Sequence, residues 1–181
     1  MGSRIPGLRL FAGAALAACA TLAASGASHA AGAWPVYTKA TSYTISYPAH
    51  WPTDRSHKDG TDFSVQSPDG EAWVGVVVLK DANPSTSLKA IDLAGLKGGG
   101  KLLSKPAYQI MNLHGTPFQT ASAFEQASTG ESLKIVMLAA RYNHHVFILT
   151  SVVAAKQATG PTHPQEAAAV DTMVKSMRIL K

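Results

Sequence analysis

Four strand-like segments separated by tight turns occupy the second half of this chain. Residues 108–126 contain two of them around His114-Gly115, and residues 132–154 contain two more around the turn at 142–144. Turns this short join strands that run in opposite directions. Much of the expected core comes from Leu133, Ile135, Met137 and Val146–Val153. The second half of the chain therefore predicts an antiparallel β-sheet.

The first half of the chain adds further strand signals. Residues 43–47 alternate large and small polar side chains, which is typical of a half-buried strand. Residues 62–67 and 73–79 flank Pro-Asp-Gly at 68–70, where Pro presets φ and Gly accepts a positive φ. We therefore expect these two segments to form a β-hairpin.

Two helices are predicted beside the strands. The first begins at Asn83, carries apolar residues at helical spacing, and ends at the triple glycine at 98–100. The second begins at a capping box formed by Thr162 and Gln165, with Pro164 in its first turn. The order of strands and helices predicts an α+β domain, an antiparallel sheet with helices packed against it.

The first thirty residues differ from the rest of the chain. Arg4 and Arg9 form a positive start, residues 10–24 are apolar and uncharged, and Ser28-His29-Ala30 provides small residues around a cleavage point. This arrangement is typical of a secretory signal. About fifteen apolar residues are too few to span a bilayer comfortably. We therefore predict an exported protein.

The fate of the N-terminus is open between two outcomes. Leu-Ala-Ala-Cys at 16–19 is similar to the lipobox of bacterial lipoproteins, in which the cysteine, here Cys19, is lipidated. The Ala/Ser/Gly tract at 20–33 would then be a flexible tether. The alternative is cleavage after Ala30. The first outcome predicts a membrane-anchored lipoprotein and the second a periplasmic protein.

Cysteine content and charge exclude several classes of function. Cys19 is the only cysteine, so cleavage after Ala30 would exclude disulfides, thiolate catalysis and cysteine-ligated zinc. Loss of Arg4 and Arg9 without any acidic residue would lower the formal net charge from +5 to +3. This charge is mild and no basic cluster accompanies it, so nucleic-acid binding is not expected.

Five sequence features occur in the order found in a known family. They are Tyr-x-Ile-x-Tyr-Pro-x-x-Trp at 43–51, a strand near Asp62-Phe63, a Ser-Leu helix start near residue 87, a His-Gly turn after Leu113, and Val-Lys-Ser-Met-Arg-Ile at 174–179. Together they resemble the PsbP-like family, which includes bacterial envelope lipoproteins of the DcrB type. The first and last patterns are the most specific, and the resemblance covers about residues 41–180.

The resemblance implies an α+β fold in which an antiparallel sheet is flanked by helices, an αβα sandwich. Together with the signal pattern, the resemblance divides the chain into a signal segment at 1–30, a linker at 31–42 and one PsbP-like domain at 43–181. Plant PsbP is an extrinsic subunit of photosystem II, but no motif in this chain transfers that role, and fold does not give function.

Histidines are the strongest candidates for site chemistry. His50 and His57 share one polar loop, and His144 and His145 are adjacent in a turn, so these four form a candidate metal site. No His-Glu-x-x-His or Cys-x-x-Cys pattern supports it. Catalysis has less support still, because no Gly-x-Ser-x-Gly motif places a nucleophile.

The function expected from the sequence is a non-enzymatic exported module for binding or assembly. Its partner would be an envelope protein or a lipid, with no cofactor. One alternative is an accessory protein that binds a metal or small ligand through the four histidines. A second alternative is a hydrolase, because Ser, His and Asp are all present.

Overall fold

The computed structural model describes residues 33–40, 42–56, 61–80, 101–156 and 160–180. The predicted signal segment with Cys19, the helix expected from Asn83, and His57 lie outside these residues. Within the described part of the chain, no helix is long and apolar enough to cross a membrane.

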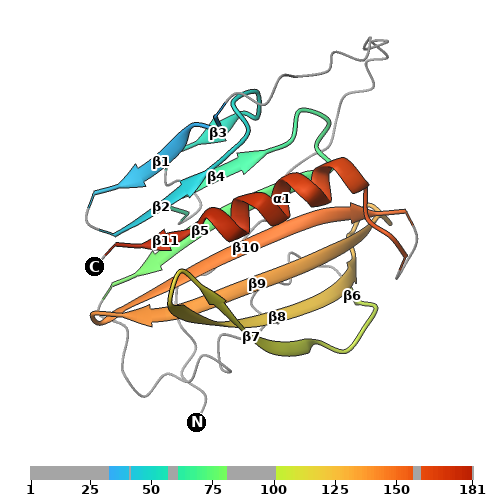
Figure 1. Cartoon of the computed structure of the whole chain (residues 1–181). Coiled ribbons are helices and arrows are strands. Elements are labelled where there is room, and N and C mark those ends of the chain that lie inside the picture. The colour runs from blue at the N-terminus through green and yellow to red at the C-terminus, as the bar shows by residue number, and fades with distance from the viewer. Residues whose placement is uncertain (1–32, 41, 57–60, 81–100, 157–159, 181) are drawn as a thin grey trace.

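Eight strands form one large antiparallel sheet (Figure 1). Its order is β3-β4-β5-β10-β9-β8-β6, and β7 also pairs with β8. The strands are β3 (Thr53–Asp54), β4 (Phe63–Gln66), β5 (Ala72–Leu79), β6 (Lys101–Leu102), β7 (Ala107–Leu113), β8 (Thr116–Gln126), β9 (Ser132–Tyr142) and β10 (His145–Ala155).

A second sheet contains three short strands in the order β1-β2-β11. They are β1 (Val36–Lys39), β2 (Tyr43–Ser46) and β11 (Arg178–Ile179). Strand β1 lies within the segment predicted as a linker, and all four of its residues pair with β2. Strand β11 brings the C-terminal end of the chain back to β2.

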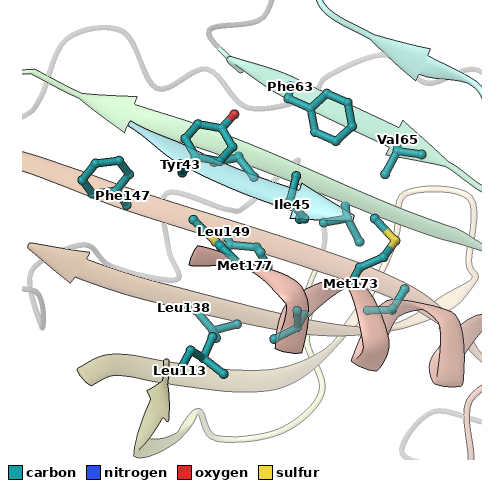
Figure 2. Packing of buried hydrophobic residues seen from close by; sticks show 14 of the residues in the cluster. Tyr43, Ile45, Phe63, Val65, Leu113, Leu138, Phe147, Leu149, Met173 and Met177 are labelled. Carbon is teal, nitrogen blue, oxygen red and sulfur yellow. The ribbon is translucent and has the colours of Figure 1, made fainter. Parts of the chain in front are cut away.

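The small sheet and the helix α1 (Pro164–Ser176) share one side of the large sheet. The helix lies over β5 and β10 and beside β2 (Figure 1). Met173 and Met177 reach from the helix end toward Ile45 of β2 and Leu149 of β10 (Figure 2). These side chains belong to the main core cluster, and Met173 is fully buried. The core is therefore a three-part junction of helix, small sheet and large sheet.

The predicted α+β sandwich, with its sheet flanked by helices, is wrong. The described residues are mostly antiparallel strand and contain one helix, which shares its side of the large sheet with the small sheet. The small sheet joins segments from the two ends of the domain, Tyr43 with Ile179. Local periodicity carries no information about pairing between distant segments. It therefore could not show that a small sheet shares this layer with the helix.

The opposite face of the large sheet carries a second apolar cluster. Its buried members are Val77, Ala121, Met137, Ala139, Val146 and Ile148. They come from the four central strands β5, β8, β9 and β10. Both faces of β5, β9 and β10 are therefore apolar, which explains why their sequences show little alternation.

The start of α1 differs from the predicted capping box. The residue before the helix is His163, and no side chain caps the first turn by a hydrogen bond. Thr162 instead bridges Ala155 at the end of β10, which takes it out of the capping position. Pro164 does occupy the first turn, as predicted.

Candidate interaction surface

The sheet edges differ in how they are protected against pairing with another chain. Strand β3 has two residues, one of them the charged Asp54. In the small sheet, β1 has four residues and ends at Lys39, and β11 has two residues including the exposed Arg178. Short length and charged side chains are the usual means by which proteins block edge-to-edge association.

Strand β7 lacks this protection. It has seven residues, Ala-Tyr-Gln-Ile-Met-Asn-Leu, with no charge and no proline. All seven pair in unbroken register with β8, so no bulge turns the strand away. Among the described strands, none pairs with its outer edge, and β7 forms the outermost strand of this border (Figure 1). Within the described part of the chain, this border is therefore an open edge.

The turn that joins β7 to β8 fixes which backbone groups face outward. Leu113 and Thr116 flank the two-residue turn and pair with each other, so they form a hydrogen-bonded pair. Because such pairs alternate along an antiparallel ladder, the N–H and C=O groups of Tyr108, Ile110 and Asn112 point away from β8. These groups are available to a further strand.

Apolar side chains accompany these free backbone groups. Ile110 is 76% exposed and Tyr108 is 61% exposed, while Met111 on the other face is 36% exposed. Ile110 lies opposite Gln119, which lies opposite Ala139 of the second apolar cluster. Directly paired residues share a face, so Tyr108 and Ile110 extend that cluster to the open edge. We call β7 with these three side chains the β7 edge.

The tip of the β7–β8 hairpin is fixed against α1. His114 donates from Nε2 to the carbonyl oxygen of Lys175 at 2.8 Å, in the last turn of the helix. His114 and Gly115 have φ of 52° and 80°, so the turn is of the type that matches strand twist. The predicted His-Gly turn is therefore confirmed, and it holds one end of β7 in place.

Replacing His114 by valine is expected to lower the free energy of unfolding by about 1–2 kcal/mol, because a β-branched residue is strained at positive φ. Asparagine tolerates this conformation, so His114→Asn should cost less than about 1 kcal/mol, from the lost hydrogen bond alone. Urea unfolding of both variants measures the difference. Equal losses would contradict the left-handed conformation at residue 114.

The predicted metal-binding histidines are not gathered in the described structure. His144 and His145 lie in the β9–β10 turn, where Nδ1 of His145 contacts the carbonyl oxygen of Asn143 at 2.6 Å. His50 precedes β3, whose Thr53 is level with Ser151 across β4 and β5. Ser151 is six residues along β10 from His145, which is roughly 20 Å.

No group of three or more His, Cys, Asp or Glu side chains within the described ranges could hold a metal ion. His57 lies outside those ranges. Of the other histidines, His114 contacts a backbone carbonyl and His163 lies 3.7 Å from Glu71. None of these contacts involves a serine, so they do not form the start of a nucleophile–base pair.

An aromatic cluster joins β1 and β2 to β4. Tyr37 stacks on Phe63 at 4.3 Å between ring centroids, and Tyr47 lies 5.4 Å from the same ring. Lys39 forms an ion pair with Asp62, whose other carboxylate oxygen accepts the Val78 N–H at 2.9 Å. These contacts connect the two sheets, so we assign them a structural role.

Tyr43 belongs to the same aromatic cluster, and its ring centroid lies 5.8 Å from that of Tyr37. Its side chain is fully buried, and its hydroxyl has no hydrogen-bond partner among the described residues. Burial raises the pKa of the Tyr43 phenol, and the neighbouring Tyr37 and Asp62 raise it further. The folded protein therefore holds this group neutral in alkaline solution.

Tyr43→Phe is expected to change the free energy of unfolding by less than about 1 kcal/mol at pH 7, since no hydrogen bond is lost. Above pH ~10 the unfolded tyrosine releases its proton while the folded one does not. Wild-type stability should then fall by about 1.4 kcal/mol per pH unit from this residue, and the variant should lack this contribution. Urea unfolding at pH 7 and pH 11 tests it, and identical losses in both proteins would contradict it.

Comparisons with known proteins support the fold. No family profile and no curated protein sequence matches the chain. Cyanobacterial PsbP (CyanoP) from Synechocystis is 12% identical with a TM-score of 0.54, over 87% of this chain and 98% of that one. A Bacteroides thetaiotaomicron protein is 14% identical with a TM-score of 0.50, over 77% of this chain, which spans 45% of its length.

LpqN of Mycobacterium tuberculosis, described as involved in cell envelope biogenesis, is 14% identical with a TM-score of 0.49 over 77% of this chain and 83% of that one. At these identities the similarity is one of fold. The arrangement of strands and helix is therefore like that of a PsbP, although the αβα sandwich expected from the resemblance is not found among the described residues.

Proposed function

We propose that this chain is a non-enzymatic, exported accessory protein of the cell envelope that binds a polypeptide strand through the β7 edge. One observation carries the proposal. Strand β7 is long and uncharged, and none of the described strands pairs with its outer side, whereas the edges at β1, β3 and β11 are short and charged. Addition of a strand to such an edge is a common mode of polypeptide recognition.

Two features support the exported location. The N-terminal thirty residues have the charged, apolar and small-residue regions of a secretory signal. CyanoP, described as a cyanobacterial PsbP, is similar in fold to this chain, and the PsbP-like family includes bacterial envelope lipoproteins. An accessory role outside the cytoplasm fits a small chain that offers a binding edge.

A variant at Ile110 tests the edge without breaking the sheet. Because the Ile110 N–H points away from β8, Ile110→Pro removes an outward donor and keeps the β7–β8 ladder intact. Ile110→Thr keeps the N–H and is the matched control. A photo-crosslinking residue at Tyr108, in the full chain expressed in its own cell, reports what lies against the edge.

The expected result is a covalent adduct to a polypeptide after irradiation. Its yield should fall at least about tenfold with Ile110→Pro and stay within about twofold with Ile110→Thr, since only proline removes a backbone donor. The same probe at Val36, exposed on the protected edge β1, provides the background. An adduct that survives Ile110→Pro at full yield would overturn the proposal.

Mass spectrometry of the mature N-terminus tests export. A chain that begins with a lipidated Cys19 would be membrane-anchored, and one that begins at Ala31 would be periplasmic. Recovery of the chain only with an uncleaved N-terminus, outside the envelope fraction, would contradict the exported location.

A further inference from the structure

We propose that the strand received by the β7 edge is β7 of a second copy of this chain, so that two molecules form a two-fold symmetric dimer with one continuous antiparallel sheet. This inference rests on the proposed function, because it requires that the edge accept a strand. It adds the identity of the partner and the register of the contact.

The geometry of β7 is self-complementary. The outward-facing residues are Tyr108, Ile110 and Asn112, which are centred on Ile110. A two-fold axis at Ile110 pairs it with Ile110 of the partner subunit and pairs Tyr108 with Asn112 of the partner subunit. Each of these three pairs is of the hydrogen-bonded kind and exchanges two bonds, so about six N–H···O bonds would form.

Charge permits this pairing at β7 and opposes it elsewhere. A two-fold axis places residues near the strand centre close to their own copies, so a charge there meets a like charge. Strand β7 has no charged residue from Ala107 to Leu113. Strands β1, β3 and β11 carry Lys39, Asp54 and Arg178 respectively. Of these four edge strands, β7 is therefore the one in which two-fold pairing brings no like charges together.

A second copy is also the occupant that is always present. An unprotected edge is a template for pairing with a matching edge on another copy of the chain. Here no proline, bulge or charge within β7 acts against the match. Pairing would place the two copies of Ile110 side by side on one face, and their exposed surface, now 76% of each side chain, would be reduced.

Continuity with the second apolar cluster supports the same arrangement. Ile110 is in one row with Gln119, Ala139, Ile148 and Val77 across the sheet. Pairing at the two-fold axis would continue this row into the partner. The contact is a single strand and is smaller than a standard interface, so we expect an equilibrium with a Kd of roughly micromolar.

Sedimentation velocity of the mature protein purified from its envelope measures the equilibrium. We expect dimer to dominate at about 100 µM and monomer at about 0.1 µM, if the Kd is of the expected order. Ile110→Pro should raise the Kd at least about tenfold and Ile110→Thr should change it by less than about threefold, because only proline removes the outward N–H. Circular dichroism melting of each variant shows that it is folded, and Ile110→Lys, which places two like charges at the axis, replaces a proline variant that does not fold.

Cysteine variants test the register. Cα atoms of a hydrogen-bonded pair lie about 5.5 Å apart, within disulfide range, so Ile110→Cys should form an intermolecular disulfide on mild oxidation. Asn112→Cys should not, because the two copies of residue 112 would be four positions apart, roughly 13 Å. A mixture of the Tyr108→Cys and Asn112→Cys variants should form the mixed disulfide.

The outcomes separate this inference from the proposed function. A monomer at all concentrations, whose Tyr108 photo-adduct to a different protein is lost with Ile110→Pro, would overturn the dimer and support the binding edge. A monomer whose adducts are insensitive to Ile110→Pro would overturn both. A dimer that survives Ile110→Pro and yields no disulfide from Ile110→Cys would place the contact elsewhere and overturn the inference. Ile110-dependent cosedimentation of a monomer with anionic lipid vesicles would identify a membrane as the occupant and also overturn it.

Discussion

Replacing Phe63 by alanine is expected to lower the free energy of unfolding by about 3–5 kcal/mol. Phe63 is fully buried in β4, at the place where the small sheet meets the large one. Its ring stacks on Tyr37 of β1 at 4.3 Å and lies 5.4 Å from Tyr47. The variant would therefore leave a cavity and also remove the aromatic contacts that join β1 and β2 to the large sheet.

Urea unfolding of the purified protein measures this loss. Phe63→Leu is the matched variant, because it keeps most of the buried volume and should cost less than the alanine variant. Val36→Ala on β1 is the surface control, and its effect should stay within about 0.5 kcal/mol because Val36 is 57% exposed. A loss of less than about 1 kcal/mol for Phe63→Ala would contradict a packed junction between the two sheets.

Sequence patterns located most of the strands because strand periodicity and turn chemistry are local properties. Residues 43–47 were predicted as a strand, and β2 covers Tyr43–Ser46. The Pro-Asp-Gly turn is confirmed, since Gly70 has a φ of 81° and its N–H bonds to the carbonyl of Ser67. In these cases the decisive interactions lie within a few residues of each other, so one segment of sequence contains them.

Local sequence patterns could not predict which distant segments pair with each other. Strand β1 lies where a linker was predicted, because Val36–Lys39 is too short to show a pattern and is stabilised by pairing with β2. Strand β11 pairs with Tyr43 and Thr44, which lie far away in the sequence, so its partner could not be inferred from local patterns. A capping box was expected before α1, yet the bridge between Ala155 and Thr162 takes precedence over local helix capping.

The candidate site was missed for a related reason. Tyr108, Ile110 and Met111 were predicted only as part of a strand, because strand periodicity does not tell whether a strand lies inside a sheet or at its edge. Only the topology shows that β7 pairs on one side alone and that its side chains are exposed. The usable signal in the sequence was the lack of any charge across seven residues of a strand. The lack of charge indicates an unprotected edge only after the structure has shown that β7 lies at the edge of the sheet.

The four histidines were predicted as metal ligands from the chemistry of imidazole, which does not tell where each residue lies in the fold. His144 lies in the β9–β10 turn with a φ of 61°. His50 lies before β3, far along the strand direction from that turn. His50 and His144 therefore lie in connections at different ends of the sheet. The metal-binding prediction therefore depends on His57, outside the described residues.

Replacing Met173 by alanine is expected to lower the free energy of unfolding by about 2–5 kcal/mol. Met173 is the fully buried residue of α1 and points from the helix into the junction with β2 and the large sheet (Figure 2). Val170 and Val174 flank it on the same buried stripe. The alanine variant would create a cavity between three packed elements that are each held by the others, so the surroundings can collapse only in part.

Met173→Leu should cost less than about 1.5 kcal/mol because it nearly conserves volume. Thr172→Ala on the exposed side of the helix should change stability by less than about 0.5 kcal/mol. Met173 lies in the main core and Ile110 on the opposite face of the sheet, so the two sites are separated by the sheet itself. Met173→Ala should therefore lower the unfolding midpoint while the folded variant keeps the wild-type dimer Kd. A change in that Kd of more than about tenfold would mean that the β7 edge depends on the helix side of the sheet, which the topology does not predict.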